Sequence, residues 1–211
     1  MSSSEPCRLY LISPPTLEDS AHFARNLPGI LEAGDVACLQ LRLKTSNEED
    51  ILNAIGFLQP VCERAEVALI LNDRPDLAAK SGCDGVHIGT GDMPYTDARA
   101  IVGEDAAVGV SCGASRHLAM IQADAGADYV AFGAFFPSPT KSDTSYASLE
   151  ILEIWSQTTN VPCVAVGGIT MENCNPIINA GADFLAVSSA VWDHPDGPKT
   201  AVRLFTEQMT G

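Results

Sequence analysis

Short apolar segments recur along the chain, and amphipathic stretches separate them. Four of these segments begin alike, with a small residue, a glycine, an aspartate one or two places later, and an apolar run. They are "AGDVACLQL" (33–41), "SGCDGVHIG" (81–89), "AGADYVAFG" (125–133) and "AGADFLAVS" (180–188). Glycine is favoured just past a helix end, and the apolar run is typical of a strand buried on both faces. Each segment therefore predicts a helix end that leads into an interior strand.

The spacing of these segments indicates further strands between them. Their glycines, at positions 34, 82, 126 and 181, lie 48, 44 and 55 residues apart, whereas one strand–helix unit needs roughly 25 residues. Four more apolar runs fill the gaps: "LYLIS" (9–13), "VALILN" (67–72), "AVGVSC" (107–112) and "PCVAVGG" (162–168). The sequence thus predicts eight strands, starting near residues 9, 36, 67, 85, 107, 129, 162 and 184.

Eight strands that alternate with helices are the pattern of a (β/α)8 TIM barrel. The amphipathic run "LEILEIW" (149–155) is one of the intervening helices. The alternative is an open doubly wound sheet, which usually carries G-x-G-x-x-G after its first strand. Here the first strand ends in "ISPPT". We therefore expect residues 1–211 to form a single α/β domain with a closed barrel.

Polar residues collect where the predicted strands end, which is where TIM barrels place their chemistry. The second strand ends in "LQLRLK", so that Gln40, Arg42 and Lys44 alternate with leucines. Period-two alternation places the three polar side chains on one face, toward the mouth of the barrel. For any one of them, a solvated strand end is an equally ordinary interpretation.

The third and fourth strands each bring a carboxylate to the same end. Asn72 and Asp73 end the third strand, and Asp92 lies in the glycine-containing loop after the fourth. Two hard oxygen ligands, completed by water and phosphate, suit Mg²⁺. Asn72 and Asp73 could instead cap the following helix, since both are favoured caps and Pro75 suits the first turn. His87, inside the fourth strand, is expected to pack or to orient its neighbours.

Hydroxyls and glycines end the remaining strands. Ser111 ends the fifth strand, Gly167 and Gly168 follow the seventh, and Ser188 and Ser189 follow the eighth and face the start of the final helix. The loops after strands seven and eight are a recurrent phosphate site in these barrels. Close helix–strand packing is the structural alternative for either glycine. The sixth strand runs into "SPTK", which gathers Ser138, Thr140 and Lys141 on a loop.

Composition narrows the classes of function. The chain carries 12 basic and 27 acidic residues, a net charge of −15, which argues against nucleic-acid partners. Its seven cysteines are scattered without C-x-x-C, as in a reduced, cytoplasmic protein, and Cys112 has no histidine near it in sequence, so a thiol nucleophile is unsupported. No apolar run reaches the roughly 18 residues of a membrane span, and the N-terminus lacks the features of an export signal.

Taken in order, these motifs resemble the thiamine-phosphate synthase (thiamine-phosphate pyrophosphorylase) family over residues 9–191. The motifs are "LQLRLK", "LND", "DGVHIGTGD", "GVS", "YVAFGAFFPSPTK", "VAVGGIT" and "AVSSAV". The resemblance implies that 4-amino-2-methyl-5-hydroxymethylpyrimidine diphosphate loses pyrophosphate and is joined to a thiazole phosphate, or to its carboxylate, to give thiamine phosphate. Catalysis would then consist mainly of charge stabilisation and positioning.

The resemblance also implies roles for individual residues. Asp73 and Asp92 would hold Mg²⁺, and Gln40 would contact the pyrimidine. The diphosphate would be held by Arg42, Lys44, Asn72, Ser111 and Lys141, among which Lys141, Arg42 and Ser111 would be catalytic. The thiazole phosphate would be received by Ser138, Thr140, Gly168, Ser188 and Ser189. Departures from the usual family pattern occur at Arg74, Thr90, Gly113, Ser138 and Ser188.

Two other functions remain open from the sequence. A related subgroup isomerises the thiazole phosphate with a histidine in the fifth-strand motif, where this chain has Gly113. A non-catalytic regulator that binds thiazole phosphate would need the phosphate cradle but not both carboxylates and Lys141 together. The sequence gives no oligomeric state.

Overall fold

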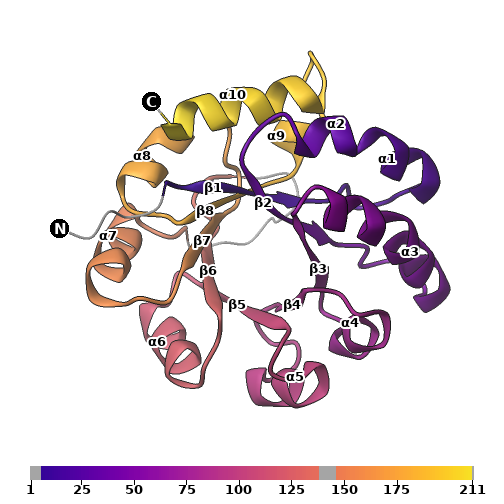
Figure 1. Cartoon of the computed structure of the whole chain (residues 1–211). Helices are drawn as coiled ribbons and strands as arrows, with labels where there is room; N and C mark the ends of the chain where they lie inside the picture. Colours follow the sequence, from indigo (N-terminus) through magenta and orange to yellow (C-terminus); the bar gives the residue numbers. More distant parts are fainter. Residues whose placement is uncertain (1–5, 138–145, 211) are drawn as a thin grey trace.

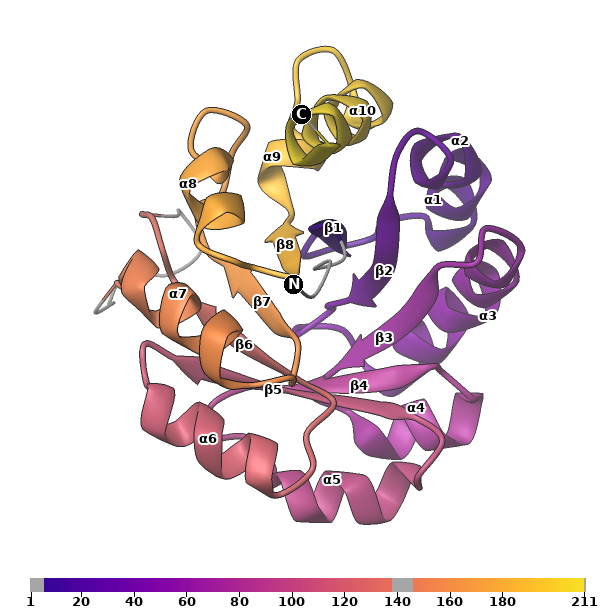
Figure 2. The same cartoon turned by 60° about the vertical axis from the view of Figure 1, so that its left-hand side comes forward.

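The computed structural model describes residues 6–137 and 146–210, and eight parallel strands in it close into a barrel. Each strand pairs with the next, and β1 pairs with β8 (Figures 1 and 2). The strands are β1 Arg8–Ile12, β2 Val36–Leu41, β3 Ala68–Asn72, β4 Gly85–Ile88, β5 Ala107–Gly113, β6 Tyr129–Gly133, β7 Cys163–Val166 and β8 Phe184–Val187. These starts lie within one residue of the expected ones, and the predicted TIM-barrel class is confirmed.

The helices lie outside the ring of strands, as Figure 2 shows. They are α1 Ser20–Asn26, α2 Pro28–Leu31, α3 Glu48–Arg64, α4 Pro75–Ser81, α5 Tyr95–Val102, α6 Arg116–Asp124, α7 Leu149–Thr158, α8 Cys174–Asn179, α9 Ser189–Trp192 and α10 Pro198–Thr210. Ser188 and Ser189 were expected to face the final helix. They instead begin the short helix α9, and α10 starts only after a further turn.

Helix α3 illustrates why these segments are helical. Asn47 caps its first turn by accepting a hydrogen bond from the Asp50 backbone N–H at 2.9 Å. Acidic residues fill that first turn, where the helix dipole favours negative charge. Its buried residues recur at three- and four-residue intervals and face the barrel: Ile51, Ala54, Ile55, Leu58, Val61 and Cys62.

The apolar core has two parts. The larger part lies between the strands and the helices and includes fully buried Leu39, Phe132 and Trp155. The smaller part fills the inside of the barrel with side chains such as Tyr10 and Tyr129. Because side chains alternate along a strand, each strand supplies both parts. The barrel interior is thus filled by side chains, and ligands can reach only its ends.

Aspartates of the repeated segments hold the N-terminal ends of the strands together. In three repeats the carboxylate accepts a hydrogen bond from the backbone N–H near the start of the preceding strand. These bonds run from Leu69 N to Asp84 Oδ2, from Val108 N to Asp128 Oδ2 and from Cys163 N to Asp183 Oδ2, each at 2.7 Å. In the first repeat Asp35 accepts from Arg8 Nε, also at 2.7 Å. The aspartates of the repeats therefore link neighbouring strands at the N-terminal end of the barrel.

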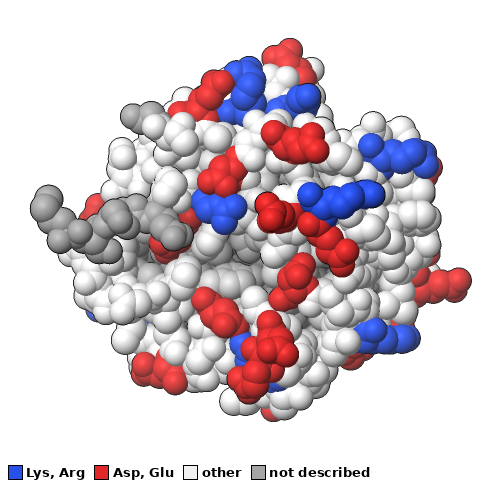
Figure 3. All heavy atoms as spheres, viewed as in Figure 1, with Lys and Arg blue, Asp and Glu red and all other residues white. Residues whose placement is uncertain are grey.

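Charged side chains of both signs are interspersed over the face shown in Figure 3, and the acidic ones predominate. That face carries no continuous basic patch in the part of the chain that the structure describes. None of the helices among the described residues combines the length and apolar character that crossing a bilayer requires.

Candidate functional site

The two carboxylates predicted to bind a metal ion lie together at the C-terminal ends of β3 and β4. A Cβ atom built on Gly89 would lie 2.2 Å from Asp92 Oδ2 and 3.5 Å from Asp73 Oδ1, so both carboxylates border the same small space. Lys44, beyond the end of β2, places its Nζ 2.7 Å from Asp73 Oδ2. Three neighbouring strands thus bring two anions and one cation to one point.

The electrostatics of this group favour a cation. Burial raises the pKa of Asp73, but the hydrogen bond and positive charge of Lys44 outweigh it and hold that pKa below its ordinary value. Burial and the neighbouring negative charge of Asp73 raise the pKa of Asp92. Among the described residues no three His, Cys, Asp or Glu side chains gather as a metal cluster. Two carboxylates are, however, a donor set that Mg²⁺ accepts when water and phosphate complete its shell.

The capping alternative for Asn72 and Asp73 is wrong. Helix α4 begins after Arg74, and that cap position makes no side-chain hydrogen bond to the helix, although Pro75 does occupy the first turn. Asp73 has a φ of 61°, a left-handed conformation that aspartate tolerates better than most residues. This backbone turn directs its carboxylate to the Gly89 N–H at 3.3 Å and to Lys44.

Gln40 and Arg42 leave the end of β2 in different environments. Gln40 is buried inside the barrel, 3% exposed, and its Nε2 donates to Tyr10 Oη at 2.9 Å. Arg42 is half-buried, and its backbone N–H donates to Ser13 Oγ at 3.0 Å. Leu41 and Leu43 are buried in the outer core, as the predicted alternation requires.

Ser111 lies near the end of β5 and contacts His87. Ser111 Oγ is 2.8 Å from His87 Nε2, and the Ser111 carbonyl accepts a hydrogen bond from Thr90 Oγ1 at 3.0 Å. Thr90 thereby ties the loop that carries Asp92 to β5. His87 is buried and packs against the Tyr129 ring, which is one of the two roles expected for it.

The turn after β7 is built around Gly168. Its φ is +65°, and an added Cβ would lie 2.5 Å from the Pro137 carbonyl oxygen, so only glycine fits. Asn173 holds this turn by donating from Nδ2 to the Gly168 carbonyl at 2.9 Å. Beyond the ends of the next two strands, β8 and β1, Ser188 Oγ donates to the Ser13 carbonyl at 3.3 Å. The close backbone packing that is the structural alternative for this glycine is therefore present.

Three predicted site residues, Ser138, Thr140 and Lys141, lie outside the described residues. The described chain reaches Pro137, beside the Gly168 turn, and resumes at Tyr146, after which the Ala147 N–H donates to the Ala134 carbonyl just beyond β6 at 2.8 Å.

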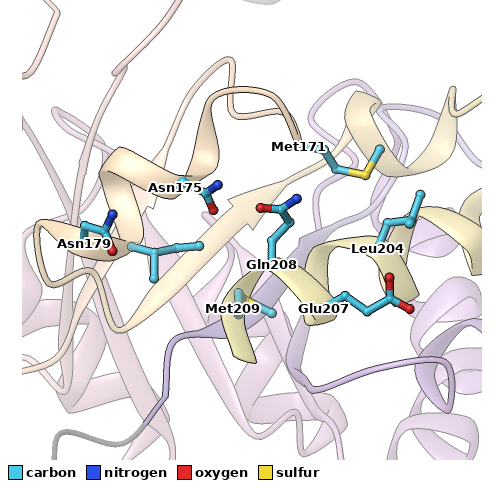
Figure 4. Close-up of a pocket in the computed structure, with 8 residues that line it drawn as sticks. Met171, Asn175, Asn179, Leu204, Glu207, Gln208 and Met209 are labelled. Carbon is cyan, nitrogen blue, oxygen red and sulfur yellow. The ribbon is translucent and has the colours of Figure 1, made fainter. Parts of the chain in front are cut away.

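Two cavities can be compared with this arrangement. One of about 150 Å³ lies at the ends of β2 and β3 and is lined by Lys44, Asn72 and Asp73 among others. A larger one, about 530 Å³, lies between α8 and α10 on the outside of the barrel, with Asn175, Glu207 and Gln208 at its walls (Figure 4). None of the described site residues lines the larger cavity. Of these two cavities, the smaller one is the one that borders predicted site residues among those described.

Sequence reasoning missed three residues that support the site. Ser13, 2% exposed at the end of β1, binds the backbone of Arg42 and accepts a hydrogen bond from Ser188. Tyr10 and Tyr129 meet inside the barrel with their hydroxyl oxygens 2.9 Å apart. A polar group inside an otherwise apolar strand, as in "LYLIS" and "DYVAF", was the available sign.

The fold and the site together define a TIM-barrel protein with two carboxylates and a lysine gathered at the C-terminal ends of neighbouring strands. The chain belongs to the thiamine monophosphate synthase family, whose model matches residues 9–191. The thiamine-phosphate synthase of Rhodospirillum centenum is 57% identical over 205 residues, which cover 97% of this chain and 99% of the relative. That of Hyphomonas neptunium is 49% identical, covering 94% of this chain and 91% of the relative.

Solved structures agree with this assignment. The thiamine phosphate pyrophosphorylase from Pyrococcus furiosus superposes with a TM-score of 0.84 at 27% identity, over 96% of this chain and 95% of that one. The orotidine 5′-phosphate decarboxylase from Pyrococcus horikoshii, with a TM-score of 0.68 at 13% identity, shares the fold alone. The family resemblance drawn from the sequence motifs is confirmed.

Proposed function

We propose that this protein is a transferase that forms thiamine phosphate from 4-amino-2-methyl-5-hydroxymethylpyrimidine diphosphate and 4-methyl-5-(2-phosphoethyl)thiazole, or its carboxylate, with release of pyrophosphate. The observation that carries this proposal is the likeness over nearly the whole chain to thiamine-phosphate synthases, at up to 57% identity. Asp73, Asp92 and Lys44 at the strand ends supply groups that this chemistry needs.

The reaction breaks one bond and forms another at the pyrimidine methylene carbon. The C–O bond to the diphosphate breaks, and its electron pair leaves with the pyrophosphate. The thiazole nitrogen then donates its lone pair to the methylene cation and forms the new C–N bond. Because charge separates before the new bond forms, catalysis depends on groups that stabilise the departing anion and hold both substrates in line.

The diphosphate side of the site is assigned to β2–β5. Asp73 and Asp92 would hold Mg²⁺, which when bound neutralises charge on the departing pyrophosphate. Burial and, after it, the negative charge of Asp73 raise the pKa of Asp92, and a cation between the two carboxylates would offset the part that is due to Asp73. Direct contacts to the diphosphate are proposed for Arg42, Lys44, Asn72, Ser111 and Lys141.

The remaining groups receive the other parts of the substrates. Gln40, at the top of the barrel interior, is proposed to contact the pyrimidine ring. The thiazole phosphate is proposed to bind at Ser138, Thr140, Gly168, Ser188 and Ser189. The positive φ of Gly168 supports this, because successive N–H groups in such a turn can point toward an anion. The mouth of the barrel would thus hold the two phosphorylated groups on opposite sides.

The test is synthesis of thiamine phosphate by the purified protein, with Mg²⁺ and then with EDTA. We expect product only with the metal ion, and a loss of roughly 100-fold or more in Lys141→Ala, the scale expected when one charge-stabilising donor is removed. Lys80→Ala is the matched control, because Lys80 Nζ bonds Glu48 at 3.1 Å on the outer helices. Folded protein that binds thiazole phosphate without making product would contradict the proposal and favour the regulator. Isomerisation of the thiazole substrate alone would favour the tautomerase.

A further inference from the structure

Five side chains form a continuous hydrogen-bonded chain through the barrel interior, with Gln40 and Ser111 at its ends. Gln40 Nε2 donates to Tyr10 Oη at 2.9 Å, and Tyr10 Oη lies 2.9 Å from Tyr129 Oη. Tyr129 Oη lies 3.1 Å from His87 Nδ1, and His87 Nε2 lies 2.8 Å from Ser111 Oγ. We call this the Gln40–Ser111 chain. It connects five different strands.

Packing holds the middle of the chain in place. The Tyr129 ring lies over Gly109, where an added Cβ would come within 1.8 Å of Cζ. The His87 ring is stacked on Tyr129 with centroids 5.7 Å apart, and Tyr10 meets Tyr129 edge to face at 5.9 Å. All three rings are at most 9% exposed. Their hydroxyl and imidazole groups therefore have few arrangements open to them.

With Gln40 donating through Nε2, the chain has one direction in which each buried donor has an acceptor, and the proton left over is that of half-buried Ser111 at its end. Burial raises the pKa of Tyr10 and of Tyr129 well above the ordinary value, so both hydroxyls keep their protons. Tyr10 Oη accepts a hydrogen bond from the Gln40 amide and can donate its own hydrogen bond to Tyr129 Oη. Tyr129 then donates to His87 Nδ1, so that His87 carries its proton on Nε2 and donates to Ser111.

The opposite direction fits less well. Tyr129 would donate to Tyr10, which already accepts from Gln40. The Tyr10 proton would then have no acceptor among the hydrogen bonds of the described residues. Ser111 Oγ would also donate its hydrogen bond to His87 Nε2 and could then act only as an acceptor toward a ligand.

We propose that Tyr129 and His87 are positioning residues that make Ser111 Oγ a hydrogen-bond donor toward the diphosphate. Because Ser111 accepts from His87, its own proton is left for the ligand, and diphosphate oxygens are acceptors. At the other end, Gln40 Nε2 donates its hydrogen bond to Tyr10 Oη. This leaves Gln40 Oε1 as the acceptor for the pyrimidine. This inference rests on the proposed function, and it assigns both ends of the chain to the same substrate.

The direction of the chain can be measured without activity. In ¹⁵N-histidine NMR spectra, His87 is expected as the Nε2–H tautomer, with an unprotonated Nδ1. The chain has four histidines, so the His87 signals are assigned by their loss in His87→Gln. In Tyr129→Phe, which keeps the ring and removes the hydroxyl, the preference for this tautomer should be lost. A wild-type Nδ1–H tautomer would overturn the proposal even if the protein made no thiamine phosphate.

Kinetics then test the positioning role. Tyr129→Phe should lower kcat/KM for the pyrimidine diphosphate roughly tenfold, the scale of one lost hydrogen bond in a chain. The KM for thiazole phosphate should stay within about twofold, because that substrate touches neither end of the chain. Tyr95→Phe is the matched control: the Tyr95 hydroxyl donates to the Gly126 carbonyl at 2.6 Å in the outer layer, and its loss should leave both kinetic constants unchanged.

Tyr10→Phe provides a second variant should Tyr129→Phe fail to fold. It leaves the Gln40 amide nitrogen without its acceptor and should also affect the pyrimidine diphosphate alone. Folded Tyr129→Phe or Tyr10→Phe with wild-type kinetics for both substrates would overturn the proposal. Equal losses for both substrates would do so as well, since they would indicate a general effect on the barrel.

Discussion

Aspartates lie at both ends of the barrel, and their partners differ. At the N-terminal end, Asp84, Asp128 and Asp183 each accept a backbone N–H at 2.7 Å from the start of a strand. At the C-terminal end, Asp73 and Asp92 face each other and Lys44. The first group uses its acceptor capacity inside the protein. The second group lies beside Lys44 at the end where TIM barrels bind ligands, and we propose that it serves binding while the first group serves stability.

Parallel strands explain the difference. At the N-terminal end of a parallel sheet, some backbone N–H groups have no carbonyl of the neighbouring strand as an acceptor. A carboxylate can accept a charge-assisted hydrogen bond from them instead. At the C-terminal end the chain turns into loops, such as the left-handed turn at Asp73. A carboxylate there is directed by the loop and not by the sheet. Removing it should affect ligand binding more than folding.

The largest expected effect is at the C-terminal end, in Asp73→Asn. Asparagine accepts the φ of 61° and preserves shape, but it removes the charge. We expect kcat/KM for thiamine phosphate formation to fall by roughly 100-fold or more, as for loss of a metal ligand or its outer contacts. The free energy of unfolding should change by less than about 1 kcal/mol, because the ion pair with Lys44 is partly exposed. Activity assays and urea unfolding of the same sample measure both. Normal activity with a large loss of stability would reverse the assigned roles.

The next effect is at the N-terminal end, in Asp128→Ala. The change removes the acceptor of the Val108 N–H and the ion-pair partner of Arg99. We expect a loss of about 2–3 kcal/mol in the free energy of unfolding, with kcat unchanged in the folded protein. Asp128→Asn is the graded control, since its amide oxygen can still accept from Val108 N–H, and it should lose less. A fall in kcat without a change in stability would show that this end is coupled to the reaction.

The fold was predictable because it repeats. Strand starts recur with the glycine–aspartate segments, so the eight-strand count and the barrel follow from their spacing together with the apolar runs between them. The role of the repeat aspartate was not predictable. Its partner is the backbone of a strand some 15 to 20 residues earlier in the chain, and a backbone N–H leaves no mark on the sequence.

The site was predictable only where residues lie at strand ends. Asp73, Asp92 and Lys44 are brought together by neighbouring strands, which period-two alternation and strand order already imply. The Gln40–Ser111 chain was not implied. Tyr10 and Tyr129 lie 119 positions apart, and they meet only because the barrel closes. Ser13 was missed because a serine after a strand resembles any turn residue.

The smallest expected effect concerns Cys112, which lies at the C-terminal end but points into the outer core. Burial raises the pKa of its thiol from 9.0 to about 12. A raised pKa means that the folded state holds the proton more tightly, so the contribution to stability is complete below pH 9 and is lost as pH rises toward 12. Relative to wild type, Cys112→Ala should therefore lose less stability between about pH 8 and about pH 10, by about 1 kcal/mol in urea unfolding.

Cys112→Ala also tests whether every side chain at the C-terminal end of the barrel serves the reaction. Its neighbour Ser111 points to the site, whereas the Cys112 side chain is 2% exposed among core residues. If the direction in which a side chain points, and not its position along the strand, decides whether it takes part in the reaction, kcat should be unchanged in Cys112→Ala. Cys163→Ala is the control from the N-terminal end, where burial likewise raises the thiol pKa to about 12, and its alkaline response should be the same. A large fall in kcat for Cys112→Ala alone would mean that the whole C-terminal end, outer face included, serves the reaction.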